Sequence, residues 1–563
     1  MKSIYKTLTG ILCLAALSQG MVSCTDAGSE LVSFEEDNRL SSPNDTVYSL
    51  LGIIGKMQVI ADRTVLLGEL RGDLTSLTAD ATLDLQAIAN FEADASNPYN
   101  NARDYYAVIQ NCNYFLANAD TALTIRGRKV FEKEYAVIKT YRAWTYLQLA
   151  LNYGAVPFIT EPLLAEKDAD PSLYPFYDVE QIAEYFINDL KPYMDTEYPD
   201  YGIMGNFATR TFYYPTRVLI GDLCLWAGRY REAAQHYHDF LTREGNQRPI
   251  GASYTVEWNG HEFENILDFY TSSFVSTSEC LTTIPMMTSE YDGIISNLRD
   301  VFCSTDKNRY YYQATHSAAY DELSQSQHYT LVYNDPVTML PDTISPDYDA
   351  LNKENSLRGD LRQMSVYYLR SATSASSDYS KLYQTCYKYS YADEVHILRL
   401  RHIYLRYAEA LNRAGLPESA FAVLKHGLFH ETLSTEKNYI SRDEQERAGD
   451  LIQFSEYYFT RGNTIGIHSY GSGRADADKT YVIPELPTRE DSILFVEDKI
   501  CDEMALETAA EGLRYYDLMR LALHRDDPTY LADKVARRNG TANIDQNLFT
   551  KLSDKKNWYL PLE

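Results

Sequence analysis

Apolar and small residues recur every three or four positions along residues 215–241 and again along residues 397–428, as in amphipathic helices. A turn interrupts each stretch. It falls at residues 227–230 in the first, and at Gly415 and Pro417 in the second, where glycine caps one helix and proline can open the next. Each stretch therefore predicts two short antiparallel helices with small residues at their crossing, as in tetratricopeptide-like repeats. Repeated helical hairpins predict a scaffold that stacks and binds other molecules.

Two more helices are predicted in the first 160 residues. Residues 47–61 read as one helix, and residues 129–153 as a longer one whose apolar stripe includes Trp144. The second helix should stop at residues 154–157, because glycine ends a helix and the following proline prevents its renewal. Residues 68–75, which combine acid, base and glycine, read as a turn. Because Trp144 belongs to an apolar stripe, we expect it in the core.

The helical rhythm weakens between residues 246 and 395. This stretch is rich in Ser, Thr, Asp and Tyr and contains strand-like pieces such as residues 329–333. Long irregular segments on a rigid scaffold tend to carry binding specificity. The predicted fold class is therefore mainly α, with tetratricopeptide-like helical hairpins and an irregular, loop-rich, minor-β region.

The first residues have the pattern of a secretory signal peptide, residues 1–23. A basic start precedes an apolar run, residues 11–17, which is too short to cross a bilayer of about 30 Å as a helix. A small serine then stands directly before Cys24, as in a bacterial lipobox. We expect Cys24 to be lipidated and residues 24–40 to form a tether; the alternative is an ordinary cysteine after a cleaved signal. The sequence thus predicts an exported protein anchored to a membrane without spanning it.

Amino-acid composition limits the classes of molecule that the protein is expected to bind. A hydrophobic content of 45% allows a sizeable core, and a net charge of -27 disfavours contact with nucleic acid or anionic lipid headgroups. The cysteines after Cys24 are scattered without a Cys-x-x-Cys motif, so we expect mostly buried free thiols. Tyrosine is abundant, with 48 residues against 4 tryptophans. Its flat ring and hydroxyl suit half-wet surfaces that contact sugars or peptides, although most single tyrosines are expected to pack between helices.

An ordered set of motifs resembles the SusD/RagB family. The motifs are Tyr141-Arg-Ala-Trp144 with residues 151–159, then Ala408-Glu-Ala-Leu-Asn412, Glu511-Gly-Leu-Arg-Tyr-Tyr-Asp-Leu-Met-Arg520 and Trp558-Tyr-Leu-Pro561. They follow the family's order and extend over nearly the whole mature chain. The resemblance implies an outer-membrane, surface-exposed lipoprotein with an α-helical body that acts as the lid of a SusC-like TonB-dependent transporter. The division it suggests is residues 1–23 signal, 24–40 tether, 41–245 N-terminal helical part, 246–395 irregular ligand-binding part and 396–563 C-terminal helical part.

The resemblance also implies where a glycan would bind: loops of the N-terminal third and the irregular part. The candidate hydrogen-bonding residues are Arg71 and Asp73, with Tyr99 and Asn101 from a Pro/Asn loop, and the candidate stacking residues are Trp258, Tyr310, Tyr311 and Tyr312. Two alternatives stay open. Arg71 and Asp73 can instead pair across a turn, and successive tyrosines of an extended segment alternate sides, so at most two can face one ligand. Starch-binding members show tryptophans where this chain has Tyr99, which leaves the ligand class open.

Catalytic and metal-binding patterns are weak in this sequence. It has no zinc-protease motif, nucleophile elbow, phosphate-binding glycine loop or dinucleotide fingerprint. The pairs Asp168/Asp170 and Asp476/Asp478 could contribute to a calcium site, but neither has the calcium-loop glycine and terminal glutamate. We therefore predict no catalytic residue, no cofactor and no metal supported by a motif.

Three functional hypotheses follow. The first is a nutrient-binding lipoprotein that hands oligosaccharides to a transporter, and the second keeps this role with peptide cargo, which the scarcity of tryptophan favours slightly. The third is a secreted glycoside hydrolase, which would need two carboxylates about 5–9.5 Å apart in a cleft. A binding screen separates the first two, and turnover of a glycan would establish the third.

Overall fold

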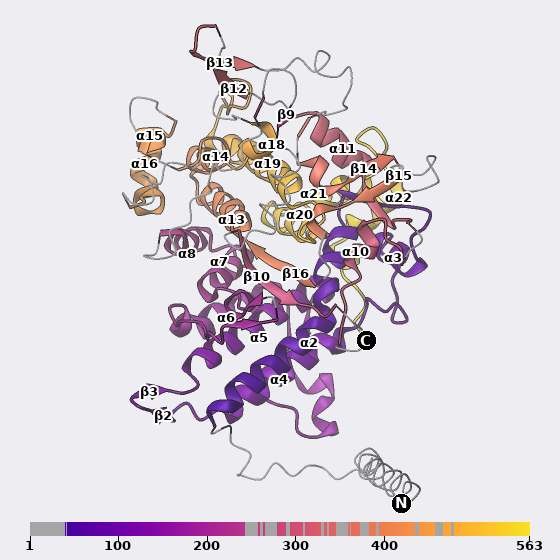
Figure 1. Ribbon diagram of the computed structural model, residues 1–563, viewed down its shortest axis with the longest axis vertical. Helices are drawn as coiled ribbons and strands as arrows, with labels where there is room; N and C mark the ends of the chain where they lie inside the picture. Colours follow the sequence, from indigo (N-terminus) through magenta and orange to yellow (C-terminus); the bar gives the residue numbers. More distant parts are fainter. Residues whose placement is uncertain are drawn as a thin grey trace, which may run out of the picture.

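The computed structural model describes a mainly α-helical protein (Figure 1). The described residues are 40, 42–205, 207–242, 257–258, 263–264, 279–288, 293–307, 310–327, 331–334, 337–344, 359–360, 362–371, 382–389, 393–428, 430–433, 439–455, 466–473 and 478–562. The predicted signal peptide and Cys24 lie outside them. The division of the chain into five parts therefore stays a prediction.

The first long helix extends further than the sequence suggests. Helix α2 (Pro43–Leu70) has 28 residues, whereas the apolar pattern predicts only residues 47–61. Gly68, expected in a turn, lies inside the helix, where its lack of a side chain lets the helix touch the backbone of Gly512. The turn begins only at Arg71. Close packing with a distant segment, which the local pattern does not reveal, thus prolongs α2.

Both predicted hairpins are present. Helices α7 (Thr216–Trp226) and α8 (Tyr230–Thr242) form the first, and α13 (Leu400–Arg413) and α14 (Pro417–Lys425) the second. Gly415 has φ = 85°, a left-handed conformation that favours glycine. Helix α13 also packs against α8, so the two hairpins stack although about 160 residues separate them. The predicted mainly α fold class is confirmed.

The other helices complete two groups, indigo to magenta and orange to yellow in Figure 1. The N-terminal group adds α3 (Leu83–Ala89), α4 (Ala102–Asn118), α5 (Glu132–Tyr153) and α6 (Val179–Leu190). The C-terminal group adds α15 (His430–Leu433), α16 (Arg442–Ala448), α18 (Ser469–Ser472), α19 (Arg489–Thr508), α20 (Arg514–His524), α21 (Pro528–Ala536) and α22 (Gln546–Leu552). Between them in sequence lie α10 (Leu298–Phe302), α11 (Ala318–Gln325) and α12 (Gln363–Val366). As predicted, α5 ends at Gly154, whose φ is 75°.

The strands form small antiparallel pairs. The pair β10 (Cys280–Pro285) and β16 (Glu394–Arg399) lies between the two groups of helices in Figure 1. The other pairs are β1 (Thr75–Leu77) with β11 (Ala314–His316), β2 (Thr124–Ile125) with β3 (Arg128–Lys129), β4 (Val156–Pro157) with β5 (Phe176–Tyr177), β6 (Ile203–Met204) with β7 (Phe207–Ala208), β8 (Glu257–Trp258) with β9 (Phe263–Glu264), β12 (Leu331–Asn334) with β13 (Pro341–Ile344), and β14 (Tyr368–Ser371) with β15 (Leu382–Thr385). The predicted strand near residues 329–333 corresponds to β12.

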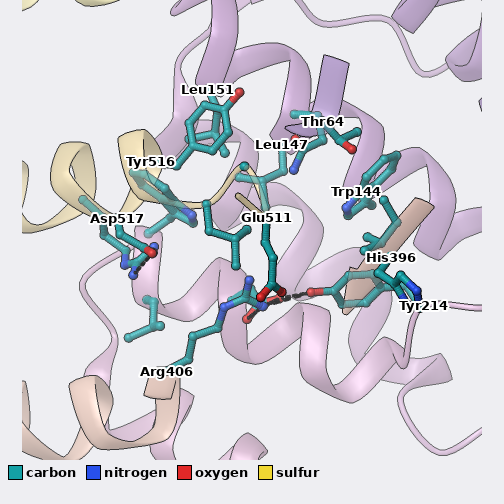
Figure 2. Close-up of a pocket in the computed structure, with 18 residues that line it drawn as sticks. Thr64, Trp144, Leu147, Leu151, Tyr214, His396, Arg406, Glu511, Tyr516 and Asp517 are labelled. Carbon is teal, nitrogen blue, oxygen red and sulfur yellow. Dashed lines mark hydrogen bonds and ion pairs between the residues drawn. The ribbon is translucent and has the colours of Figure 1, made fainter. Parts of the chain in front are cut away.

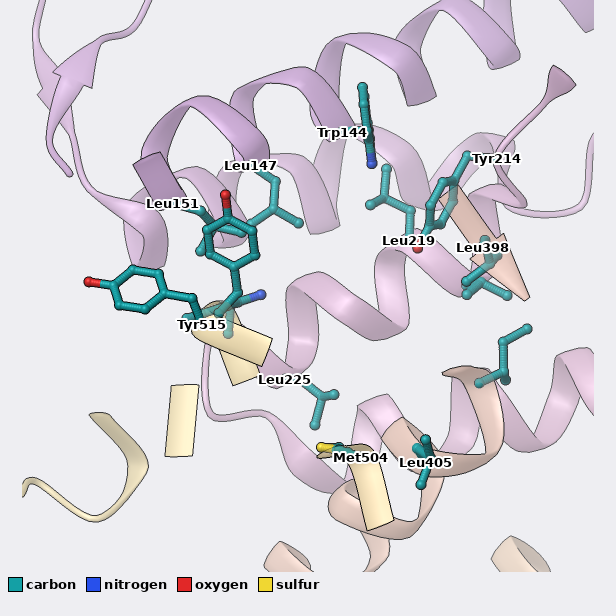
Figure 3. Packing of buried hydrophobic residues seen from close by; sticks show 14 of the residues in the cluster. Trp144, Leu147, Leu151, Tyr214, Leu219, Leu225, Leu398, Leu405, Met504 and Tyr515 are labelled. Atoms are coloured by element: carbon teal, nitrogen blue, oxygen red, sulfur yellow. The ribbon is translucent and has the colours of Figure 1, made fainter. Parts of the chain in front are cut away.

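Buried apolar side chains from both groups of helices meet in one core (Figure 3). Trp144 is 4% exposed, which confirms its expected place in the core. Leu219 and Leu398, from α7 and β16, are fully buried in the same cluster. Burial of apolar side chains is the main force that holds such helices together. The six cysteines among the described residues are also buried and free, as expected.

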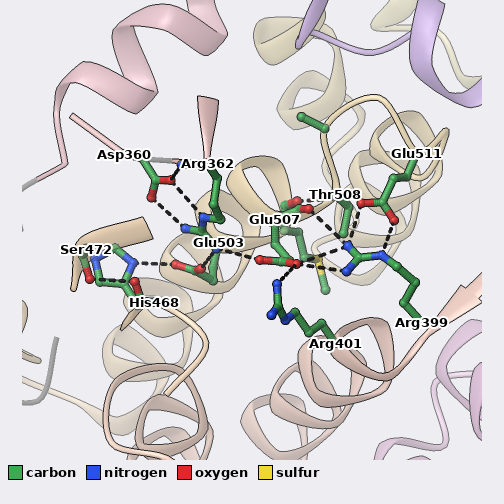
Figure 4. A network of polar contacts seen from close by, with 12 residues as sticks. Asp360, Arg362, Arg399, Arg401, His468, Ser472, Glu503, Glu507, Thr508 and Glu511 are labelled. Carbon is green, nitrogen blue, oxygen red and sulfur yellow. Dashed lines mark hydrogen bonds and ion pairs between the residues drawn. The ribbon is translucent and has the colours of Figure 1, made fainter. Parts of the chain in front are cut away.

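A row of buried ion pairs crosses the C-terminal half (Figure 4). Glu503, Glu507 and Glu511 stand four residues apart, the first two on one face of α19 and the third just after its end. Their N–O distances to arginines are 2.6 Å for Arg362–Glu503, 3.0 Å for Arg362–Glu507, 3.0 Å for Arg401–Glu507, 3.2 Å for Arg399–Glu507 and 2.6 Å for Arg399–Glu511. Burial alone would raise the pKa of Glu507, but the guanidinium groups of Arg401 and Arg399 outweigh it and hold the pKa below its usual range. We call these six residues the glutamate row.

His402, beside the glutamate row, predicts an acid-sensitive stability. Its Nδ1 accepts the backbone N–H of Arg399 at 3.3 Å, and its Nε2 lies 2.8 Å from a carboxylate oxygen of Glu511. The imidazole is therefore neutral, with its proton on Nε2. Burial lowers the pKa of His402 to about 4, although Glu511 opposes this shift.

Lowering the pH should therefore weaken the fold through His402. Between pH about 6.5 and about 4 the unfolded chain binds one more proton at this residue than the folded chain, so the free energy of unfolding falls by about 1.4 kcal/mol per pH unit. Urea unfolding at several pH values measures this slope. His402→Gln, whose amide can accept and donate the same two hydrogen bonds but does not titrate, should have a slope that is shallower by this amount. An equal slope in both proteins would contradict the assignment.

None of the described helices is both long and apolar enough to cross a membrane.

Candidate functional site

Arg71 lies at the end of α2 and is 1% exposed. Its guanidinium donates to the carbonyl of Leu67 at 2.8 Å, to Asn152 Oδ1 at 2.5 Å and to the carbonyl of Trp558 at 3.2 Å. The guanidinium carbon lies 4.4 Å from the centroid of the Tyr515 ring. Arg71 therefore joins α2, α5, α20 and the C-terminal segment, and its predicted role as a ligand contact is wrong because the core uses its donors.

Asp73 is likewise a core residue. Its two carboxylate oxygens accept from Arg514 at 2.6 and 2.9 Å, and the residue is 4% exposed. Burial alone would raise the pKa of Asp73, but the Arg514 guanidinium outweighs it and lowers the pKa. The alternative pairing of Arg71 with Asp73 is not found either, because each has a different partner. The prediction that Asp73 contacts a ligand is therefore also wrong, because both of its carboxylate oxygens are used by Arg514.

The Pro/Asn loop contributes one half-exposed aromatic ring. Tyr99 packs partly against the core, and burial raises the pKa of its hydroxyl, with a smaller contribution from the charge of Asp62. Asn101 caps α4: its side-chain oxygen accepts the backbone N–H of Arg103 at 3.2 Å, and its carbonyl accepts from Arg63 at 3.2 Å. Tyr99 can thus contact a ligand, whereas the side-chain oxygen of Asn101 is already used in the cap.

Two of the three consecutive tyrosines are exposed. Tyr310 is 48% and Tyr311 42% exposed, while Tyr312 is less so and its carbonyl accepts from Thr78. The expectation that at most two of them face one ligand stays a prediction. The ring of Tyr310 lies edge-on to that of Tyr383, 5.7 Å between centroids.

Trp258 belongs to β8, opposite Phe263, but its side chain lies outside the described part of the structure. Its predicted role as a stacking residue stays a prediction.

The structure brings the Pro/Asn loop and the tyrosine segment to neighbouring places. Strand β1 pairs with β11, and Thr78 Oγ1 donates to the Tyr312 carbonyl at 2.6 Å. On the other side, Asp62 of α2, close enough to Tyr99 to affect its titration, accepts from Ser296 Oγ at 2.6 Å and from the backbone N–H of Asn297 at 2.7 Å. From these contacts we infer one candidate surface, which we call the tyrosine face, made of Tyr99, Asn297, Lys307, Tyr310 and Tyr311.

The chemistry of the tyrosine face suits a neutral polar ligand. Tyr310 and Tyr311 offer flat apolar rings, and Lys307, whose side chain is 60% exposed, donates to Asn297 Oδ1 at 3.1 Å and lies 3.0 Å from Asp300. Rings beside amide, ammonium and carboxylate groups can contact the apolar faces and the hydroxyls of a sugar at once. Sequence reasoning missed Asn297 and Lys307, because only the contact of the 296–297 turn with α2 shows that they lie near Tyr99.

A small cavity of about 70 Å³ lies between the two groups of helices (Figure 2). It is lined by Trp144 of α5, Asp222 of α7, His396 of β16 and Arg406 of α13, among others. Asp222 accepts from Tyr214 and Tyr237, each at 2.6 Å, and lies 3.0 Å from Arg406, so these charges already have partners. The volume suffices for about five waters and is far below that of an oligosaccharide site. This cavity is therefore not the nutrient site.

Metal ligands do not gather in the part of the chain that the structure describes. It contains no group of three or more His, Cys, Asp or Glu residues placed to hold an ion. Asp170 instead caps a short helix through the backbone N–H of Ser172, and Asp478 accepts from Thr480. Asp476 lies outside the described residues.

Comparison with known proteins gives matches among solved structures only. No family model and no curated protein matches the chain. A SusD superfamily protein from Bacteroides vulgatus has a TM-score of 0.55 and 13% identity over 92% of this chain and 95% of its own. A SusD-like carbohydrate binding protein from Bacteroides fragilis has a TM-score of 0.53 and 14% identity over 88% of both chains, and one from Bacteroides vulgatus has 0.51 and 13% over 85% of this chain and 84% of its own. The chain therefore has the SusD fold, which confirms the resemblance seen in its motifs at the level of fold.

Proposed function

We propose that this protein is a nutrient-binding lipoprotein of the cell surface that captures oligosaccharides and delivers them to a SusC-like TonB-dependent transporter in the outer membrane, acting as its lid. The tyrosine face on a SusD fold is the observation that carries the proposal. Two solved proteins of this fold are described as SusD-like carbohydrate binding proteins. The proposed role is binding and not catalysis.

The anchoring part of the proposal rests on the sequence alone. The apolar run followed by Ser23 and Cys24 is typical of a lipoprotein signal, and lipidated Cys24 with residues 24–40 as a tether would hold the protein at the outer membrane. The tether would keep the protein close to a transporter in the same membrane and so raise the effective concentration of the protein at that transporter. The net charge of -27 makes nucleic acid an unfavourable partner.

Removing rings from the tyrosine face should weaken saccharide binding. We expect calorimetric titration against a panel of oligosaccharides to give heat with at least one glycan, and Tyr311→Ala or Tyr99→Ala each to weaken that binding about tenfold or more, since each removes a contact ring. Weaker saccharide binding in both variants would show that the Pro/Asn loop and the tyrosine segment belong to the same binding site. Tyr48→Ala is the matched control: Tyr48 is 72% exposed and lies on α2, 14 residues or about 21 Å before Asp62.

The other outcomes separate the alternatives. Heat with peptides alone, lost in the same variants, would replace the saccharide by peptide cargo. Turnover of any glycan by the purified protein would establish a glycoside hydrolase and overturn the binding role. Binding that survives both Tyr99→Ala and Tyr311→Ala would place the ligand away from the tyrosine face.

A further inference from the structure

A cysteine, a histidine and a glutamate form a chain of contacts on the central strand pair. Cys280 Sγ of β10 lies 3.0 Å from His396 Nδ1 of β16, and His396 Nε2 lies 3.4 Å from Glu394 Oε1 of the same strand. The nitrogen nearer the sulfur can share a proton with it, while the carboxylate holds the other nitrogen. This is the order of groups that activates a cysteine as a nucleophile.

The strand pairing explains how these three side chains meet. Glu394 and His396 are two residues apart on β16 and so point to the same face. Cys280 stands opposite Arg399, three residues from His396, but the register shifts between Cys280 and Thr283. Such a bulge redirects a side chain, and here it allows the sulfur to reach the imidazole ring. The arrangement is therefore built into the central strand pair.

The groups around His396 favour its protonated form. Burial alone would lower the pKa of His396, but Cys280 and Glu394 outweigh it and raise the pKa to about 10. The nearby charges of other elements are engaged elsewhere: Asp222 with Arg406, Glu511 with Arg399, Glu279 with Arg401. Asp517 and Arg520, which also line the cavity, pair with each other.

Burial keeps the thiols of three other described cysteines in their neutral form. Burial raises the pKa of the Cys112 and Cys224 thiols to about 12 and that of Cys303 to about 11. These thiols stay protonated at neutral pH and are inert toward electrophiles, because the thiolate is the nucleophile. They serve as internal references for Cys280.

The burial of Cys280 limits what can reach its sulfur. His396 lines the cavity of about 70 Å³, while Cys280 itself is 6% exposed. Only a reagent with a narrow end can therefore approach Cys280. A protein disulfide or a bulky aromatic reagent would be excluded by size.

We propose that Cys280 is a reactive thiolate, paired with the His396 imidazolium, that exchanges with small, low-molecular-mass disulfides. The Cys280 sulfur attacks one sulfur of the reagent, a new S–S bond forms and the S–S bond of the reagent breaks. The departing thiolate takes the proton from His396 Nδ1, which leaves a neutral imidazole beside a mixed disulfide. The reagent is the oxidant, so the step needs no other reactant. This inference is independent of the proposed nutrient binding.

Alkylation of the folded full-length chain by iodoacetamide, read cysteine by cysteine by peptide mass spectrometry, tests the ion pair. We expect Cys280 to react at least tenfold faster than Cys112 and Cys224 at neutral pH, and its rate to change less than about threefold between pH about 6 and about 8. An ordinary thiol of pKa about 8.5 would slow nearly a hundredfold over the same range. Bis(2-hydroxyethyl) disulfide should then give a mixed disulfide at Cys280 that dithiothreitol removes.

Two variants check the cause. His396→Gln should restore the steep pH dependence of an ordinary thiol and slow the reaction at pH about 6 by more than tenfold. Glu394→Gln should produce a smaller shift in the same direction with little risk to folding, and circular dichroism reports whether each variant is folded. A steep pH dependence in the unmodified chain, no reaction of Cys280 in the folded state, or alkylation without a mixed disulfide would each overturn the proposal.

Discussion

Glu507→Gln is expected to lower the free energy of unfolding by about 3–5 kcal/mol, because it removes the central charge of the glutamate row. The carboxylate of Glu507 lies within 3.2 Å of nitrogens of Arg362, Arg399 and Arg401 and is 3% exposed. Without it, three buried guanidinium groups lose the one carboxylate that they share. Urea or thermal unfolding of the variant and the unmodified chain measures the difference.

Asp498→Asn is the matched control for this prediction. Asp498 also lies on α19 and forms an ion pair with Arg525 at 2.7 Å, but its side chain is 55% exposed. Water screens such a pair, so its loss should cost less than about 1 kcal/mol. Equal losses in the free energy of unfolding for the two substitutions would show that burial does not increase the contribution of the glutamate row to stability.

Gly68→Ala is expected to destabilise the protein by about 3 kcal/mol or more, because α2 touches the Gly512 turn there without a gap. A methyl group at Gly68 would come within 1.7 Å of the carbonyl oxygen of Gly512 and 2.7 Å of the Tyr516 ring. A backbone oxygen cannot rotate away as a side chain can, so α2 would have to move from its contact with α20. Thermal unfolding would detect the loss.

Gly55→Ala distinguishes crowding from helix propensity. Gly55 lies on the same helix, but a methyl group there would meet no atom within 4 Å. Alanine favours a helix over glycine, so this variant should be more stable by about 0.5–1 kcal/mol. The opposite signs at the two positions are the result to look for. Similar destabilisation by Gly55→Ala and Gly68→Ala would mean that a methyl group anywhere on α2 lowers stability, and that the contact with Gly512 is not the cause.

Local patterns predict the helices and turns of this chain better than its contacts between distant segments. The two hairpins, with their turns at residues 227–230 and at Gly415, follow from apolar spacing and from glycine and proline. The length of α2 does not, because residues 61–70 are held in the helix by packing against the Gly512 turn. The glutamate row was not foreseen either, since its arginines come from distant parts of the sequence.

Contacts between distant segments also separate the candidate site residues into two groups. Tyr310 and Tyr311 are exposed and Tyr99 is partly buried, and the role of all three as ligand contacts stays a prediction. Arg71 and Asp73 were misjudged, because charged residues in a short polar segment look exposed from sequence alone. Their partners, Asn152 and Arg514, lie 81 and 441 residues away in the chain.

The last residues of the chain close the fold of its beginning. The Trp558 carbonyl accepts from Arg71, which follows α2, and from the Tyr515 hydroxyl, and the backbone N–H of Leu560 donates to the Asn152 carbonyl of α5. During synthesis, α5 is made about 400 residues, and α2 nearly 490 residues, before these partners exist. Until the C-terminal segment arrives, some donors of Arg71 have only water as a partner. The contacts that tie α2 and α5 to residues 558–560 therefore form only after nearly all of the chain has been made.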